Sequence, residues 1–134
     1  MKVLALDFGP ARTGVAVSDP TGTLARPLGV VERAASEQGV ARLAELVRRE
    51  AAERVVVGLP VTLRGERGAQ AAETERFVES LRIVLDVPVD TFDERFTTRL
   101  AQASAGAGAR GEEDALAAAH LLTTYLEWTA ATTP

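Results

Sequence analysis

Residues 2–19 read KVLALDFGPARTGVAVSD. The segments 2–8 and 14–19 are mainly apolar, and the turn-rich residues 9–13 between them form a connection of hairpin length. We therefore expect two strands that pair as a hairpin. A third strand, predicted over 28–32, would extend them into an antiparallel meander.

After residue 35 the apolar residues recur at helical spacing. This spacing predicts four helical segments: 36–53, with Ser36 as its N-cap, 69–85, one beginning at Thr97, and 112–128. Two predicted strands, 54–58 and 88–92, alternate with them, and the run Val55-Val56-Val57 is typical of a central strand covered on both faces. The tail 129–134 is expected to fray.

The order of these elements predicts an α/β fold. Its mixed five-stranded sheet would contain three antiparallel strands followed by two parallel ones, with right-handed crossovers and helices on both faces. A length of 134 residues fits a single domain over 1–134.

The composition of the chain excludes several kinds of functional site. The chain has no cysteine and a single histidine, His120, which excludes disulfides, thiolate metal sites, a cysteine nucleophile and a two-histidine mechanism. No charge-free stretch is long enough to span a bilayer, and Asp7 interrupts the first apolar run before a signal peptide could form, so we expect a cytoplasmic protein with no membrane partner. The net charge of −4 argues weakly against a general nucleic-acid coat.

Acidic residues follow two of the predicted strands, at the sheet edge where sites form. Asp7 ends the first strand, Asp93 and Glu94 follow the fifth, and Asp114 lies in the first turn of the last helix on its small, apolar face. Converging carboxylates repel one another unless a cation neutralises them. Mg²⁺ or Mn²⁺ suits such oxygen donors, and two ions about 4 Å apart can promote phosphodiester cleavage.

Each acid also has a structural alternative. Asp7 could form an ion pair with Arg12, Glu94 could cap the helix near Thr97, and Asp114 could favour the helix dipole. The spacing does not choose between Asp93 and Glu94.

Four short motifs resemble those of the YqgF family, also described as RuvX-like: LDFG with Arg12 and GVAVSD, VGLP with Gly65, DERFTT, and DALAA at residues 114–118. They occur in order along almost the whole chain. The family's usual Asn is replaced here by Thr62, and the connection before Asp114 is short and rich in Ala and Gly.

The resemblance implies a ribonuclease-H-like fold with Asp7, Glu94 and Asp114 as metal-binding catalytic acids. It also implies a role for Arg12 and Thr97 near the substrate phosphate. The family is associated with maturation of the 5′ end of pre-16S rRNA, and with Holliday-junction cleavage as the alternative.

We add Arg64 and Arg67 as candidate contacts to the nucleic-acid backbone, since Arg binds phosphate without reading sequence. The first hypothesis is therefore a metal-dependent endonuclease acting on structured RNA or branched DNA. A non-catalytic nucleic-acid-binding protein is the second, and an actin-like phosphotransferase, which needs two such domains, is the third. Junction cleavage, which requires two coordinated cuts, would predict a homodimer.

Overall fold

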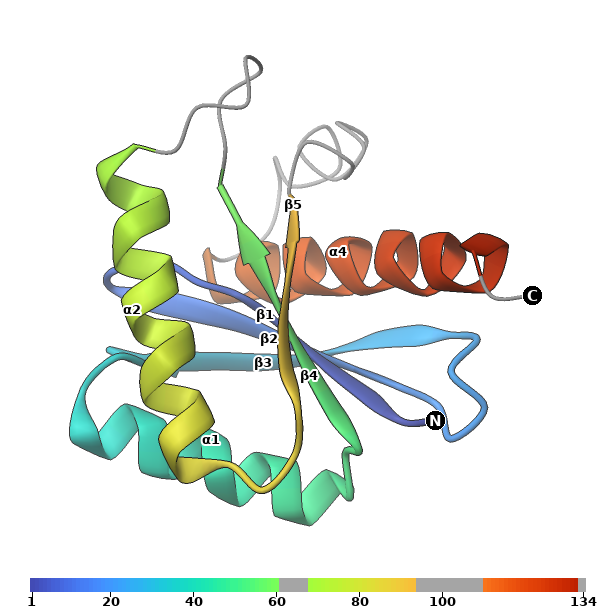
Figure 1. Ribbon diagram of the computed structural model, residues 1–134, viewed down its shortest axis with the longest axis horizontal. Coiled ribbons are helices and arrows are strands. Elements are labelled where there is room, and N and C mark those ends of the chain that lie inside the picture. The colour runs from blue at the N-terminus through green and yellow to red at the C-terminus, as the bar shows by residue number, and fades with distance from the viewer. Residues whose placement is uncertain (61–67, 94–109, 133–134) are drawn as a thin grey trace.

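The computed structural model describes residues 1–60, 68–93 and 110–132. Five strands form one sheet in the order β3-β2-β1-β4-β5 (Figure 1). Their bounds are β1 Val3–Asp7, β2 Arg12–Ser18, β3 Ala25–Glu32, β4 Arg54–Leu59 and β5 Val89–Asp93. The predicted α/β class and the mixed five-stranded sheet are confirmed.

Strand β1 is the centre of the sheet. It pairs antiparallel with β2 and parallel with β4, while β3 extends the antiparallel half and β5 the parallel half. Sequential strands joined by short turns pair antiparallel, whereas those separated by a helix return in parallel, as their connections predict.

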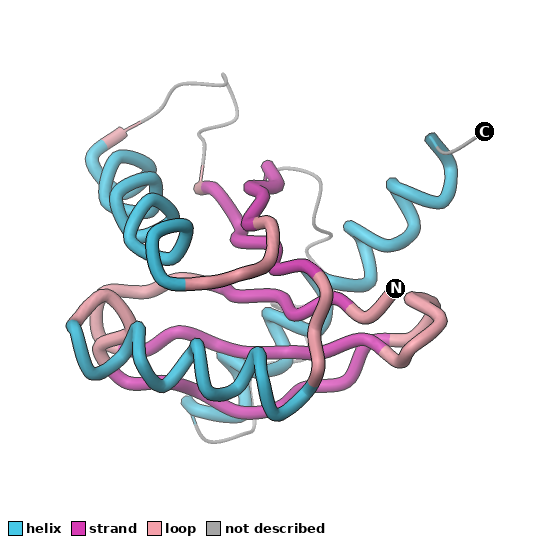
Figure 2. Tube along the Cα trace, turned by 60° about the horizontal axis from the view of Figure 1, so that its bottom comes forward, coloured by secondary structure: helices cyan, strands magenta, loops and turns pink. Residues whose placement is uncertain are grey.

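Helices cover both faces of this sheet. Helices α1 (Glu37–Glu50) and α2 (Ala69–Val84) pack on one face, and α4 (Arg110–Thr132) crosses the other (Figures 1 and 2). The helix predicted to begin at Thr97 lies outside the described residues.

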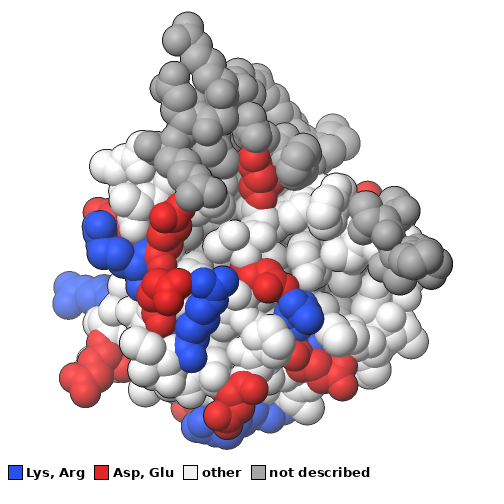
Figure 3. All heavy atoms as spheres, in the orientation of Figure 1, with Lys and Arg blue, Asp and Glu red and all other residues white. Residues whose placement is uncertain are grey.

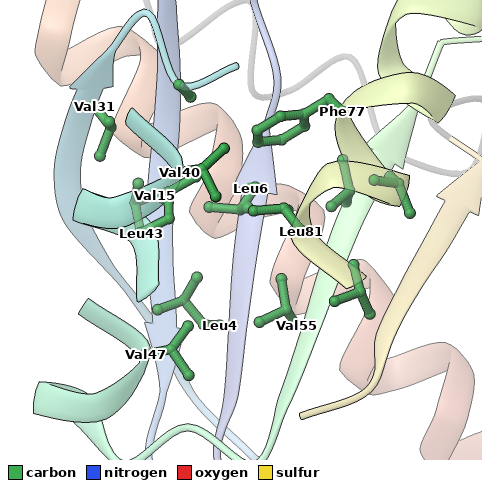
Figure 4. Close-up of a cluster of buried hydrophobic side chains, with 14 of the residues drawn as sticks. Leu4, Leu6, Val15, Val31, Val40, Leu43, Val47, Val55, Phe77 and Leu81 are labelled. Atoms are coloured by element: carbon green, nitrogen blue, oxygen red, sulfur yellow. The ribbon is translucent and has the colours of Figure 1, made fainter. Parts of the chain in front are cut away.

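The alternation of β1 divides the core in two. Leu4 and Leu6 point to the α1–α2 face, where they meet Phe77 and Leu81 of α2 (Figure 4). Val3 and Ala5 belong to the cluster beneath α4, which includes Ala118, Leu121 and Leu122. Since successive strand residues alternate in direction, one five-residue strand supplies both cores.

Several predicted boundaries were wrong. Strand β3 begins three residues before the predicted Leu28. Ser36 does cap α1, accepting a 3.0 Å hydrogen bond from the amide of Gly39, but Ala51 is the exposed C-cap of that helix, with a left-handed φ of 54°.

The prediction of a frayed tail was wrong for residues 129–132, which continue α4. The hydroxyl of Thr129 donates to the Tyr125 carbonyl within that last part of the helix. Within the described segments, no helix combines the length and the apolar character needed to cross a membrane.

The turn between β2 and β3 is organised by Asp19. Its carboxylate accepts hydrogen bonds from the hydroxyl of Thr21 and from the amides of Thr23 and Leu24. These donors, the Thr21 hydroxyl most of all, hold the pKa of the Asp19 carboxyl well below its ordinary value of 3.8. Asp19 follows the end of β2 that lies opposite the start of β1, so this motif residue has a structural place at the far end from Asp7.

We expect Asp19→Asn to lower the free energy of unfolding at neutral pH, because a neutral amide accepts these hydrogen bonds less strongly. The folded pKa is lowered, so the contribution of the carboxylate is complete above the unfolded pKa of 3.8 and is lost as the pH falls below it. Thermal unfolding of both proteins from about pH 7 to about pH 3 should show the difference shrinking in acid. A difference that stays constant would contradict this assignment.

Candidate active site

Asp7 is the last residue of β1, where the strand leaves the sheet. Alternation places its side chain on the α4 face with Val3 and Ala5. The next residue, Phe8, turns to the opposite face and stacks on Phe77, with ring centroids 4.4 Å apart. This contact anchors the end of β1, so Asp7 sits on a supported backbone at the carboxyl edge of the central strand.

Gly14 faces Asp7 directly across the β1–β2 pairing. A Cβ atom at Gly14 would lie 1.9 Å from the carbonyl oxygen of Asp114 in α4, far inside van der Waals contact. Helix α4 therefore lies against the bare backbone of β2 at this point. The missing side chain lets the backbone of Asp114 come down beside the strand position that pairs with Asp7.

Arg12 completes this constellation. It begins β2, two residues before Gly14 and thus on the same face, and its Nε donates a 2.8 Å hydrogen bond to Oδ2 of Asp114. The two side chains are 34% and 31% exposed, so the pair is partly open to solvent. This ion pair joins residues that are 102 positions apart in the sequence, and the alternative pairing proposed for Arg12 was with Asp7.

Asp114 is not in the first turn of its helix. Helix α4 begins at Arg110, two residues before the predicted start, and the acidic residues of its first turn are Glu112 and Glu113. A favourable interaction with the helix dipole therefore explains those two residues rather than Asp114. As predicted from its spacing, Asp114 shares the sheet-facing side of α4 with the buried Ala118 and Leu121.

Strand β5 places Asp93, one of the two acids between which the sequence does not choose. Phe92 packs in the core beneath α4, whereas Val89 packs in the opposite core. Alternation therefore puts Asp93 on the α2 face, away from the face that carries Asp7 and Asp114. Glu94 lies outside the described residues.

The oxygen donors in this region suit a hard cation. Asp7 and Asp114 offer only carboxylate oxygens, with no cysteine anywhere in the chain, and this is the donor chemistry that Mg²⁺ and Mn²⁺ prefer. Within residues 1–60, 68–93 and 110–132, no three His, Asp or Glu side chains form a group that could hold a metal ion. Four other predicted site residues, Glu94, Arg64, Arg67 and Thr97, fall outside those ranges.

The sequence did not lead us to predict that two glycines help to position the site. Besides Gly14, Gly9 lies in the β1–β2 connection, where a Cβ atom would come within 2.5 Å of the Arg12 carbonyl oxygen. This close approach folds the connection tightly enough to return the chain at Arg12. The available signal for Gly14 was its place inside an otherwise apolar strand, which often marks a close backbone approach.

Acidic and basic side chains are interspersed over the described part of the face shown in Figure 3, without one large area of a single sign. Separate ion pairs such as Arg49–Glu45 and Arg82–Glu79 contribute to this mixed distribution of charge. The described part of this face therefore presents no large basic patch.

The RuvX family, described as Holliday junction resolvase, matches residues 1–128. The chain belongs to this family. A relative from Rubrobacter xylanophilus, named "Putative pre-16S rRNA nuclease", is 48% identical over 131 residues, covering 94% of the chain and 92% of the relative. One of the same name from Chloroflexus aggregans is 47% identical over 100 residues, 75% of the chain and 70% of the relative.

A solved structure of similar fold is Thermus thermophilus RuvC in complex with a Holliday junction substrate. It has a TM-score of 0.62 and 23% identity, covering 99% of this chain and 98% of that one. At that identity the similarity establishes the ribonuclease-H-like fold, as expected from the motifs. Membership of the RuvX family therefore rests on sequence, and the fold agrees with it.

We expect Gly14→Ala to displace α4 and move Asp114 relative to Asp7, because the new methyl group meets a backbone oxygen that cannot rotate away. Overpacking of this kind costs about 1–3 kcal/mol of the free energy of unfolding, measurable by urea denaturation. Gly68→Ala is the control, since a Cβ atom there has open space. Equal effects of the two substitutions would show that the contact at Gly14 is unimportant.

Proposed function

We propose that this RuvX-family protein is a metal-dependent endonuclease that hydrolyses phosphodiester bonds, acting in 5′-end maturation of pre-16S rRNA. The observation that carries the proposal is the meeting of β1, β2 and α4 at Gly14, which brings the Asp7 and Asp114 positions together beside Arg12. We further propose that residues 1–134 form one nuclease domain and that it works in the cytoplasm.

Asp7 and Asp114, with Glu94 as the third acid, would hold the metal, which we propose to be two Mg²⁺ or Mn²⁺ ions. When bound, the ions supply a more acidic water and neutralise charge on the phosphate. Of Asp93 and Glu94, the second is favoured because Asp93 lies on the other face of the sheet.

The remaining residues would bind and orient the substrate. The Nε of Arg12 donates to Asp114, so the guanidinium would be within reach of a phosphate that approaches that carboxylate. Arg64, Arg67 and Thr97 stay candidates for further backbone contacts, since Arg and hydroxyl side chains bind phosphate without selecting a base.

Structured RNA is the proposed partner because of the names of the relatives in Rubrobacter and Chloroflexus. The description of the RuvX family favours a second candidate, cleavage of four-way DNA junctions. Junction cleavage would require a homodimer to make two coordinated cuts, whereas trimming of one RNA strand would not.

The test compares the wild-type protein and Asp7→Asn on a pre-16S rRNA fragment and on a four-way junction, each with Mg²⁺ or Mn²⁺ and with EDTA. We expect the wild type to cut the RNA only when metal is present, and the variant to be slower by more than about 100-fold, beyond the loss typical of an indirect metal contact. Cleavage of the junction alone would transfer the proposal to the second candidate. Binding without any cleavage would leave a non-catalytic protein.

A matched pair of neighbours tests the third acid. Glu94→Gln should abolish metal-dependent cleavage, whereas Asp93→Asn should keep it within about threefold of wild type, because a side chain on the α2 face cannot join Asp7 at the metal. Initial rates at saturating Mn²⁺, with circular dichroism as a check on folding, measure both. The reverse order of the two effects would refute this assignment.

A further inference from the structure

The Arg12–Asp114 pair joins a residue that would bind the metal to one that would bind the phosphate. In the structure Asp114 binds Arg12 rather than a metal ion, and Arg12 binds Asp114 rather than a phosphate. A carboxylate that already neutralises a guanidinium is a poorer ligand for a metal ion, because the two positive charges repel each other. An arginine held by a carboxylate also has fewer donors left for a phosphate.

We propose that Arg12 and the divalent metal exchange on the Asp114 carboxylate. In the metal-free protein Arg12 is the counter-ion of Asp114; metal binding displaces it and so releases the guanidinium to the substrate phosphate. This inference rests on the proposed nuclease function. It adds that the substrate-binding arginine becomes available only after the metal site is loaded.

The backbone at both ends of the pair is held in place. Arg12 is the first residue of β2, and it lies opposite Glu32 in the pairing of β2 with β3. The carbonyl of Asp114 lies against Gly14. An exchange therefore needs rotation of side chains only. Since aspartate is short and arginine is long, the carboxylate stays where it is and the guanidinium moves.

The partial exposure of the pair makes such an exchange inexpensive. Both side chains are about one-third exposed, and ion pairs open to solvent contribute little net free energy, so a doubly charged ion can replace the guanidinium. Among the described residues, Arg12 is the one cation within ion-pair distance of Asp114. A different carboxylate, Glu50, is shared by Lys2 and Arg26, so loss of either cation there leaves a second in place.

The alternative is that Arg12 keeps its bond to Oδ2 while the metal takes the other oxygen. Arg12 would then orient the ligand, as groups hydrogen-bonded to metal ligands commonly do. The two possibilities predict opposite changes in the affinity for the metal when Arg12 is removed. Removing a competitor raises the affinity for the metal, whereas removing an orienting group lowers it.

The experiment measures Mn²⁺ affinity by electron paramagnetic resonance of the free ion, without substrate, so activity is not the readout. We expect Arg12→Gln to bind Mn²⁺ about two- to fivefold more tightly than wild type, the range that corresponds to an exposed ion pair. Arg12→Lys, which keeps a positive charge, should stay closer to wild type. Arg26→Gln is the control for loss of a surface arginine and should leave the affinity unchanged.

A double substitution shows whether the effect acts through Asp114. In an Asp114→Asn background the carboxylate for which the two cations compete is gone, so Arg12→Gln should no longer raise the affinity. An undiminished gain in that background would mean that Arg12 acts on the metal only as a distant charge, and it would overturn the exchange.

The release of Arg12 is observed directly by ¹⁵N NMR of arginine Nε–H groups during a Mg²⁺ titration. The Arg12 signal should lose its hydrogen-bond protection as the metal site fills. Arg82 is an internal control, because its Nε donates to the Val89 carbonyl at 3.1 Å and should not respond. A protected Arg12 signal at saturating Mg²⁺ would overturn the exchange.

The outcomes separate this inference from the proposed function. Failure of the wild type to bind Mn²⁺ would overturn both. Binding of Mn²⁺ by wild type that Arg12→Gln leaves equal or weaker would overturn the exchange and leave the metal-dependent nuclease in place.

Discussion

The contact between the backbone of Gly14 and the carbonyl of Asp114 is the constraint on which the arrangement of the site depends. Helix α4 and strand β2 are distant in the sequence, and no side chain at position 14 keeps them apart. The close approach is supported by small residues further along the interface, since Ala5 and Ala16 of the sheet and Ala118 and Ala119 of the helix are all buried there. The same contact therefore lets α4 pack closely on the sheet and places the carboxylate of Asp114.

Because each strand is pleated, its successive side chains point to opposite faces of the sheet, and this decides which residues pack in each core and which acids share a face. In β1 the alternation that sends Leu4 and Leu6 into the core beneath α1 and α2 sends Asp7 towards α4. In β5 the same rule separates Phe92 from Asp93. Register across the sheet therefore selects which acids can act together, because a shift of one residue would exchange the two faces.

Much of the fold could be predicted from local patterns. Local sequence was enough to predict the hairpin of β1 and β2, the strand β4 from its apolar run and the helix α1 from its amphipathic spacing. The N-cap of α1 could be predicted from Ser36 alone. Boundaries that depend on neighbours were predicted less well. Strand β3 extends to Ala25 because β2 offers it a pairing edge, and α4 continues past Trp128 as far as Thr132.

The sequence by itself determined which functional groups are available. It has no cysteine and one histidine, and it places acids where strands end, so carboxylates are the groups that it could offer to a hard cation. It could not determine which carboxylate each charged group would face. The pairing of Arg12 with Asp114 spans 102 residues, and the placement of Asp93 on the α2 face follows from the burial of Phe92 beneath α4. Both depend on how α4 and β5 pack against the finished sheet, and such long-range geometry leaves no local pattern in the chain.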